Sequence, residues 1–254
     1  MNLEHYIKTR RQQKDILLMT HIVLGYPSFD GSLRLVETMV KAGVDLMELQ
    51  IPFSEPMADG PIIMKASQES LEHGATLERC FETAEKICSE FDIPFLFMSY
   101  CNILHKYGFQ SFAEKMKAIG IKGAIVPDIP PEESQDYVAA MKQQQLDPIF
   151  LFAPNSSDAR MKTIEKTGSG FIYCVARKGV TGANTDFSED ISGYLERSRA
   201  ATELPLAVGF GIKQKADIDA VKGLVDVAII GTESIRVMDA EGLDGVDRFI
   251  RSLV

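Results

Sequence analysis

Residues 44–61, VDLMELQIPFSEPMADGP, read as a strand, a stiff loop and the start of a helix. Side chains on a strand alternate between two faces, so Glu48 and Gln50 point to the same side of this one. Prolines restrict the backbone of the following loop, and Pro61 suits the first turn of a helix. The loop also carries a second acid, Asp59. The segment therefore predicts one βα unit with two carboxylates near the carboxyl end of its strand.

The spacing of these acids leaves two interpretations open. Glu48 and Asp59 can meet at one mouth and act as a catalytic pair. Alternatively, Glu48 is a buried ion-pair partner and Asp59 caps the helix that begins at Pro61. Ion pairs perturb carboxylates as catalysis does, so the acids do not identify a reaction by themselves.

Short β-branched or aromatic runs alternate with amphipathic stretches along the chain, which is typical of βα units repeated around a parallel sheet. We expect strands at residues 17–24, 44–51, 94–99, 123–127, 148–152, 171–175, 206–208 and 225–230. We expect helices at residues 32–42, 77–91, 109–118, 131–144, 158–166, 191–201, 213–222 and 243–253, and an extra helix at residues 2–12 ahead of the first strand.

Eight regular units in 254 residues match the size of a closed (β/α)₈ TIM barrel, which we favour over an open doubly wound sheet. Hydrophobic residues make up 45% of the chain, enough for a full core. No long Gly-, Ser- or Pro-rich linker divides the sequence, so we expect a single α/β domain over residues 1–254.

The composition excludes several classes of protein. A net charge of −9 disfavours binding to nucleic acid. The sequence has neither a signal-peptide pattern nor an apolar run long enough to span a bilayer, so we expect a cytoplasmic protein with no membrane contact. The four cysteines and four histidines are scattered without the spacing of a metal site or a disulfide framework, and we predict no bound metal.

Glycine-bearing loops follow three of the last predicted strands. They are KGVTG at 178–182, GFGI at 209–212 and GT at 231–232. Glycines expose backbone amides that suit a phosphate, and the loops after strands seven and eight of a TIM barrel commonly form such a site. The alternative is that each glycine only enables a tight turn.

With these motifs in order, the chain resembles the α subunit of tryptophan synthase over nearly its whole length. The residues that carry the resemblance are 48–61, YCN at 100–102, DIPPEE at 128–133, GVTG at 179–182 and GFGI at 209–212. The resemblance implies cleavage of indole-3-glycerol phosphate to indole and glyceraldehyde 3-phosphate in tryptophan biosynthesis. It also implies that indole passes to a β subunit that uses pyridoxal phosphate, within an αββα tetramer, and that this chain needs no cofactor of its own.

The retro-aldol reaction needs a general acid, because indole C3 must gain a proton. Glu48 can supply that proton and then act as base on the glycerol hydroxyl. The resemblance implies that Asp59 interacts with the indole N–H and stabilises positive charge on the ring. It assigns Thr181 to a mobile loop over the substrate, beside Asp59. It assigns the phosphate to Gly182, Gly211, Gly231 and Thr232, and the indole ring to Met98, Tyr100, Ile125, Leu151, Tyr173, Phe210 and Ile229.

The chain departs from the family pattern at four positions. Gln50 stands where glycine is usual, Glu55 where aspartate is usual, Ala176 where serine is common, and His21 where an aromatic residue borders the indole site. We expect Gln50 to hydrogen-bond Glu48 or to crowd the indole. Glu55 is expected to face the β subunit.

Three functions are compatible with these residues: an indole-glycerol-phosphate lyase, a catalytically silent allosteric partner of the β subunit, and another phosphate-binding barrel enzyme such as a sugar-phosphate isomerase. Retention of both Glu48 and Asp59 favours the lyase.

Overall fold

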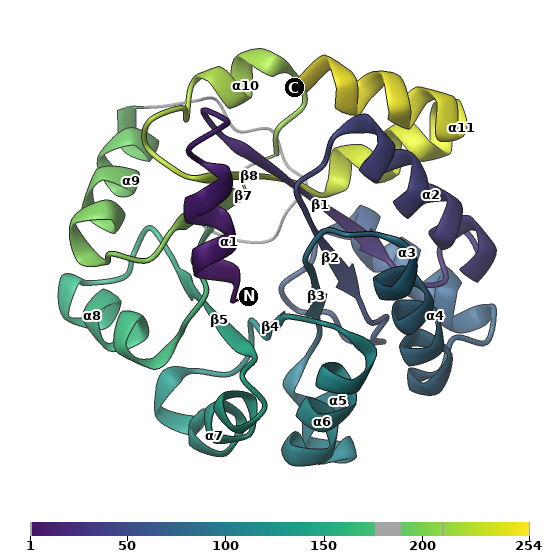
Figure 1. The fold of residues 1–254 in the computed structure, drawn as a ribbon, viewed down its shortest axis with the longest axis horizontal. Coiled ribbons are helices and arrows are strands. Elements are labelled where there is room, and N and C mark those ends of the chain that lie inside the picture. The colour runs from purple at the N-terminus through teal and green to yellow at the C-terminus, as the bar shows by residue number, and fades with distance from the viewer. Residues whose placement is uncertain (1, 176–188, 210, 254) are drawn as a thin grey trace.

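Eight parallel strands close into a barrel within the residues that the computed structural model describes, which are 2–175, 189–209 and 211–253 (Figure 1). Each strand pairs with the next in chain order, and the eighth pairs with the first. The strands are β1 (Leu17–Val23), β2 (Leu46–Gln50), β3 (Phe95–Met98), β4 (Gly123–Ile125), β5 (Asp147–Phe152), β6 (Ile172–Val175), β7 (Leu206–Gly209) and β8 (Val227–Ile230). The predicted (β/α)₈ barrel is confirmed.

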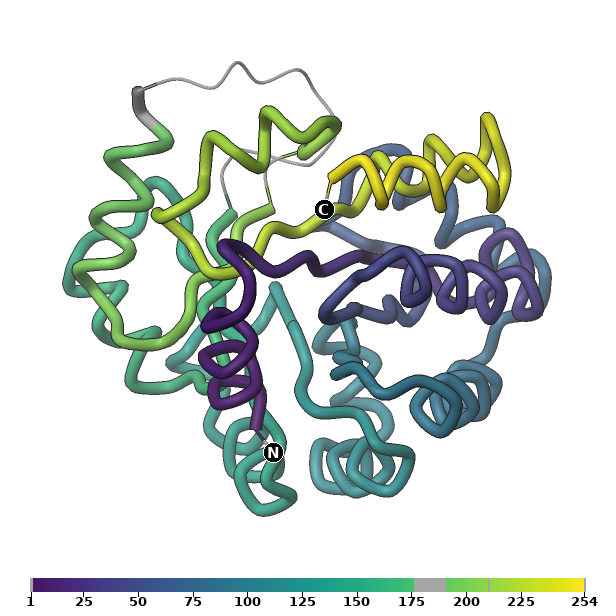
Figure 2. The backbone as a smooth tube through the Cα atoms, turned by 45° about the horizontal axis from the view of Figure 1, so that its top comes forward, coloured from purple at the N-terminus to yellow at the C-terminus, as the bar shows by residue number. Residues whose placement is uncertain are grey.

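Helices surround the barrel, as the amphipathic stretches predict (Figures 1 and 2). They are α1 (Leu3–Arg10), α2 (Phe29–Ala42), α3 (Pro61–Glu72), α4 (Leu77–Glu90), α5 (Cys101–Tyr107), α6 (Phe109–Ile119), the 3₁₀ turn η1 (Pro131–Glu133), α7 (Gln135–Gln143), α8 (Asp158–Thr167), α9 (Glu189–Ala201), α10 (Lys215–Asp219) and α11 (Thr232–Leu253). None of the described helices is long and apolar enough to cross a membrane.

Three helices differ from the sequence-based expectation. The helix expected at 213–222 is only the short α10. Helix α11 begins directly after β8 at Thr232, and Gly242 interrupts it with a φ of 67°. The sequence analysis predicted only the part after this break. Helix α5 was not predicted, because its single stretch of 7 residues is too short for a clear period.

The alternation of side chains in β2 divides the core into two layers. Leu46 joins the cluster inside the barrel, whereas Met47 and Leu49 join the cluster between the sheet and the outer helices. Leu3 and Ile7 of α1 also pack against the inner cluster, and the Leu3 backbone N–H donates to Asp147 Oδ2 at 3.0 Å. Because α1 covers the end of the barrel where β5 begins, the carboxyl ends of the strands are left for a functional site.

Candidate active site

Glu48 lies inside the mouth of the barrel and contacts a histidine on the neighbouring strand. The parallel pairing of β1 and β2 sets His21 opposite Glu48. Their side chains meet with 2.7 Å between His21 Nδ1 and Glu48 Oε1. The exposed fractions are 3% for His21 and 4% for Glu48. The acid is thus buried and held by one hydrogen bond, and it has no other side-chain partner among the described residues.

Asp59 is held above the same mouth by two donors. Gln50 Nε2 donates to Asp59 Oδ2 at 2.7 Å, and the Tyr100 hydroxyl donates to the same oxygen at 2.8 Å. The Ala58 backbone N–H donates to the Tyr100 hydroxyl at 3.2 Å, which ties the loop down a second time. Asp59 is 5% exposed. The loop after β2 therefore folds back so that the Asp59 side chain is buried at the barrel mouth.

Two of the alternatives that the sequence left open for these residues are wrong. Asp59 does not cap α3, because the N-cap is Gly60, which makes no side-chain cap hydrogen bond. The amide of Gln50 bonds Asp59 and not Glu48. Gln50 is the last residue of β2, one step nearer the mouth than Glu48 on the same face, so its amide reaches the returning loop.

Burial and hydrogen bonds have opposite effects on the pKa values of the charged groups in this mouth. Burial opposes a charged His21 ring, but the hydrogen bond and charge of Glu48 and the charge of Asp59 outweigh it and raise the pKa of His21. Burial raises the pKa of Asp59, while His21 and the donors Gln50 and Tyr100 oppose that rise. Burial and the Asp59 charge also raise the pKa of Tyr100, so its hydroxyl keeps the proton it donates.

Apolar side chains form the floor below the acids. Met98, Ile125 and Ile229 are buried in the inner cluster, with Leu151 and Tyr173 packed against it. Burial raises the pKa of Tyr173, and the charges of Glu48 and Asp59 raise it further. Gly209 makes room for that hydroxyl, since a Cβ there would lie 2.7 Å from it.

Several polar atoms at the mouth have no hydrogen-bond partner within the described part of the chain. They are His21 Nε2, Glu48 Oε2 and Gln50 Oε1. Buried polar atoms are normally paired, so these three atoms mark where a bound molecule would interact. The described residues contain no cluster of three or more His, Cys, Asp or Glu side chains that could hold a metal ion.

The candidate phosphate residues are described only in part. Gly211 follows β7 with a φ of 84°, and Gly231 and Thr232 join β8 to the first turn of α11. Strands β7 and β8 are neighbours, so both loops leave the same edge of the barrel. Thr181, Gly182 and Phe210 lie outside the described residues, as does Ala176.

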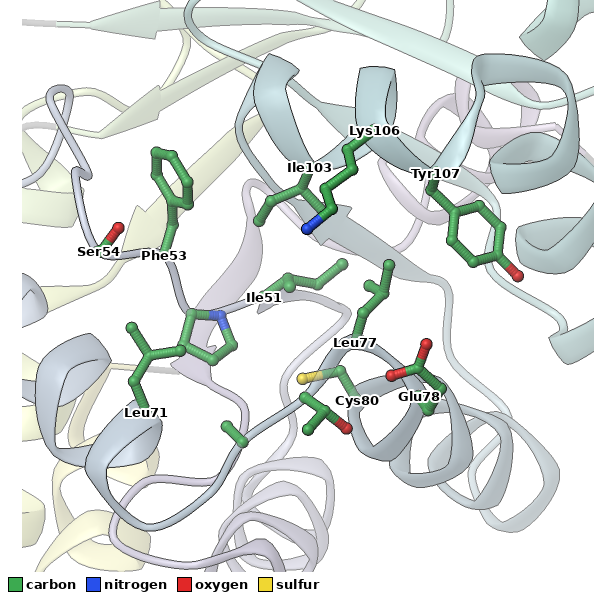
Figure 3. Close-up of a pocket in the computed structure, with 13 residues that line it drawn as sticks. Ile51, Phe53, Ser54, Leu71, Leu77, Glu78, Cys80, Ile103, Lys106 and Tyr107 are labelled. Atoms are coloured by element: carbon green, nitrogen blue, oxygen red, sulfur yellow. The ribbon is translucent and has the colours of Figure 1, made fainter.

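A separate cavity of about 490 Å³ lies outside the barrel interior, between the end of β2 and helices α3, α4 and α5 (Figure 3). Its wall is mainly apolar and includes Ile51, Phe53, Leu77 and Ile103. Neither acid lines it. Phe53 connects the two regions, because its ring stacks on Tyr100 with 5.3 Å between centroids.

Sequence reasoning missed the partners of both acids. The histidines were treated as scattered, although His21 lies opposite Glu48 in the barrel. The signal was the pairing of two neighbouring parallel strands, whose register the sequence does not state. Tyr100 was expected to contact the indole ring, and its hydroxyl also anchors Asp59, which the sequence did not indicate.

Comparisons with known proteins give one consistent result. Residues 7–249 match the family model described as tryptophan synthase alpha chain. The tryptophan synthase alpha chain of Desulforapulum autotrophicum is 61% identical over 251 residues, 99% of each chain, and that of Syntrophotalea carbinolica is 58% identical with the same coverage. Among solved structures, tryptophan synthase of Mycobacterium tuberculosis superposes with a TM-score of 0.92 at 29% identity, covering 99% of this chain and 96% of that one. Tryptophan synthase subunit alpha of Legionella pneumophila gives 0.90 at 28% identity, with coverage of 100% and 97%.

Proposed function

The chain belongs to the tryptophan synthase alpha chain family and is a lyase that cleaves indole-3-glycerol phosphate, and we propose that Glu48 and Asp59 are its catalytic acids. One observation carries this assignment. Two buried carboxylates, from β2 and from the loop that follows it, lie at the same barrel mouth, each held by different hydrogen-bond partners. Chemistry in this fold gathers at that end of the strands.

In the proposed mechanism, Glu48 is the acid and then the base. Its unpaired Oε2 delivers a proton to indole C3, which leaves a positive charge on the ring. The bond between C3 and the glycerol chain then breaks, and its electron pair returns to the ring. The adjacent hydroxyl gives its proton to Glu48 as it becomes the aldehyde of glyceraldehyde 3-phosphate. The proton given to C3 stays on the indole product, and the hydroxyl proton takes its place on Glu48, so Glu48 ends protonated as it began.

Asp59 acts as a fixed negative charge. Its carboxylate accepts a hydrogen bond from the indole N–H and stabilises the ring when C3 is protonated. The donors Gln50 and Tyr100 support this role, because hydrogen bonds to a carboxylate favour its charged form. They also fix the carboxylate before the substrate arrives.

The remaining contacts follow the family resemblance. The phosphate binds the backbone at Gly182, Gly211 and Gly231 and the amide and hydroxyl of Thr232. The start of α11 at Thr232 supports this, because a helix N-terminus attracts anions. The indole ring packs on Tyr100, Tyr173 and Phe210, and Thr181 lies over the substrate beside Asp59.

The partner in this proposal is a tryptophan synthase β subunit, within an αββα tetramer in the cytoplasm. It binds the pyridoxal phosphate and receives the indole, and this chain needs no cofactor of its own. The loop that carries Asp59 supports such an interface: Glu55 on it is exposed, and Met57 is 73% exposed, which is unusual for a large apolar side chain.

The test is release of glyceraldehyde 3-phosphate from indole-3-glycerol phosphate, with and without a β subunit. We expect cleavage that rises when the partner is added. Glu48→Gln should nearly abolish cleavage and still assemble with the partner in gel filtration. Substantial residual cleavage would remove Glu48 from its role. A native chain that stimulates the β reaction without cleaving substrate would instead be a silent allosteric partner.

A further inference from the structure

The hydrogen bond between His21 and Glu48 is built into the barrel. The two residues lie opposite each other on neighbouring parallel strands, and both side chains point inside. With 2.7 Å between Nδ1 and Oε1 and almost complete burial, water does not compete for the bond. It occupies one oxygen of Glu48 and one nitrogen of His21, and leaves Oε2 and Nε2 without a partner among the described residues.

We propose that His21 is a positioning residue for Glu48, and that the two side chains hold one working proton between them. This inference rests on the proposed function, in which Glu48 is the general acid. One bond to the imidazole fixes the carboxyl rotamer, so that the second oxygen is the one presented to the substrate. With Nδ1–H donating to Oε1, the neutral carboxyl holds this proton on Oε2 and the charged pair holds it on Nε2 of the ring, which are the two atoms left without a partner among the described residues.

Other groups that face His21 support a shared proton. Glu48 comes from β2 and Asp59 from the loop after it, and both charges act on the ring. Tyr173 of β6 and Tyr100, which directly precedes α5, face the same mouth but keep their protons, because burial raises the pKa of each. The other neighbour of β1 is β8, and the uncharged Gly231 that follows it lies beside the His21 side chain. Two carboxylates thus share one base, which favours retaining a proton.

This arrangement predicts a pH dependence with a definite sign. The pair can act as an acid only while it holds its proton. The pKa of His21 is raised above its ordinary 6.5, so activity should persist to a pH above 6.5 and fall as pH rises through that higher pKa.

The experiment compares His21→Phe with His21→Asn in the full chain, using pH profiles of kcat and kcat/KM for substrate cleavage. Phenylalanine removes the hydrogen bond and the titration. Asparagine keeps a nitrogen donor near the position of Nδ1 but cannot titrate. We expect His21→Phe to lower kcat about 10- to 100-fold with a small change in KM, since a misplaced acid costs rate more than binding. His21→Asn should recover much of kcat, and both variants should lose the alkaline limb that tracks His21.

A second measurement does not depend on activity. Ring-labelled histidine NMR of the native chain should show one buried histidine titrating above 6.5, assigned by its absence in His21→Asn, and this pKa should fall in Glu48→Gln. His5→Asn is the matched control, because it makes the same change at an exposed histidine on α1.

Unchanged kcat and an unchanged alkaline limb in His21→Phe would overturn the proposal. So would a His21 titration that is the same in Glu48→Gln. If His21→Phe lowers the rate equally at every pH and keeps the alkaline limb, His21 is only a structural contact and the proposal fails. If the native chain cleaves no substrate, the proposed function fails, while the NMR titration still decides whether the pair shares a proton.

Discussion

The Tyr100 hydroxyl makes two hydrogen bonds to the loop that carries Asp59, and Tyr100→Phe removes these two bonds alone. The hydroxyl donates to Asp59 at 2.8 Å and accepts from the Ala58 N–H at 3.2 Å, while the ring stacks on Phe53. A phenylalanine keeps the ring contacts. A buried hydrogen bond to a charged group contributes about 1.5–3 kcal/mol. If that energy supports Asp59 in the transition state, kcat/KM should fall about 10- to 150-fold, at roughly 1.4 kcal/mol for each factor of ten.

The same substitution should move the acid limb of the pH profile. Burial raises the pKa of Asp59, and the Tyr100 hydrogen bond is one of the interactions that oppose the rise. Without it the pKa rises further. Since Asp59 works in its charged form, activity in the variant should begin to fall at a higher pH as the solution is acidified.

The assay is release of glyceraldehyde 3-phosphate, coupled to its dehydrogenase, across the acid limb. Tyr137→Phe is the matched control, because Tyr137 is buried and its hydroxyl donates to the Ala124 carbonyl at 3.1 Å, away from the acids. It should lower stability without moving the limb. Native kcat/KM and a native acid limb in Tyr100→Phe would refute the anchoring of Asp59 by this hydroxyl.

Two further predictions test the floor of the mouth and the closed end of the barrel. Gly209→Ala should raise KM for the substrate, because its Cβ would lie 2.7 Å from the Tyr173 hydroxyl and displace that ring; Gly193→Ala, where a Cβ meets nothing within 4 Å, is the control, and an unchanged KM would contradict the prediction. Asp147→Ala should lower the free energy of unfolding by about 2–4 kcal/mol in urea titration, since it removes acceptors for the Leu3 N–H and the Ser169 hydroxyl, with kcat unchanged. A loss below about 0.5 kcal/mol would show that this carboxylate does not anchor α1.

The sequence was sufficient to predict the barrel because its strands and helices differ in period. The alternation in residues 44–51 correctly separated inner from outer side chains, and Pro61 does begin α3. Helices that a glycine interrupts were harder to predict. The helix predicted at 243–253 covers only the part of α11 after Gly242, although α11 begins at Thr232.

For the site, the sequence predicted only which side chains of β2 point into the barrel. The alternation of side chains correctly predicted that Glu48 points into the barrel. The hydrogen-bond partner of Glu48 depends on the register between β1 and β2, which closure of the whole barrel determines. The position of Asp59 depends on how the loop folds back. That fold is held by Gln50, whose expected contact with Glu48 is replaced by one with Asp59.

The two departures from the family pattern at this mouth, His21 and Gln50, make physical sense together. Each puts a polar side chain in the buried mouth, where an unpaired polar group would cost stability. Each instead bonds one acid: His21 holds Glu48 and Gln50 holds Asp59. The acids are therefore anchored separately, by β1 and by β2 with the Tyr100 hydroxyl, and neither has to share a donor with the other. A single reversion at either position should disturb one acid and leave the hydrogen bonds of the second in place.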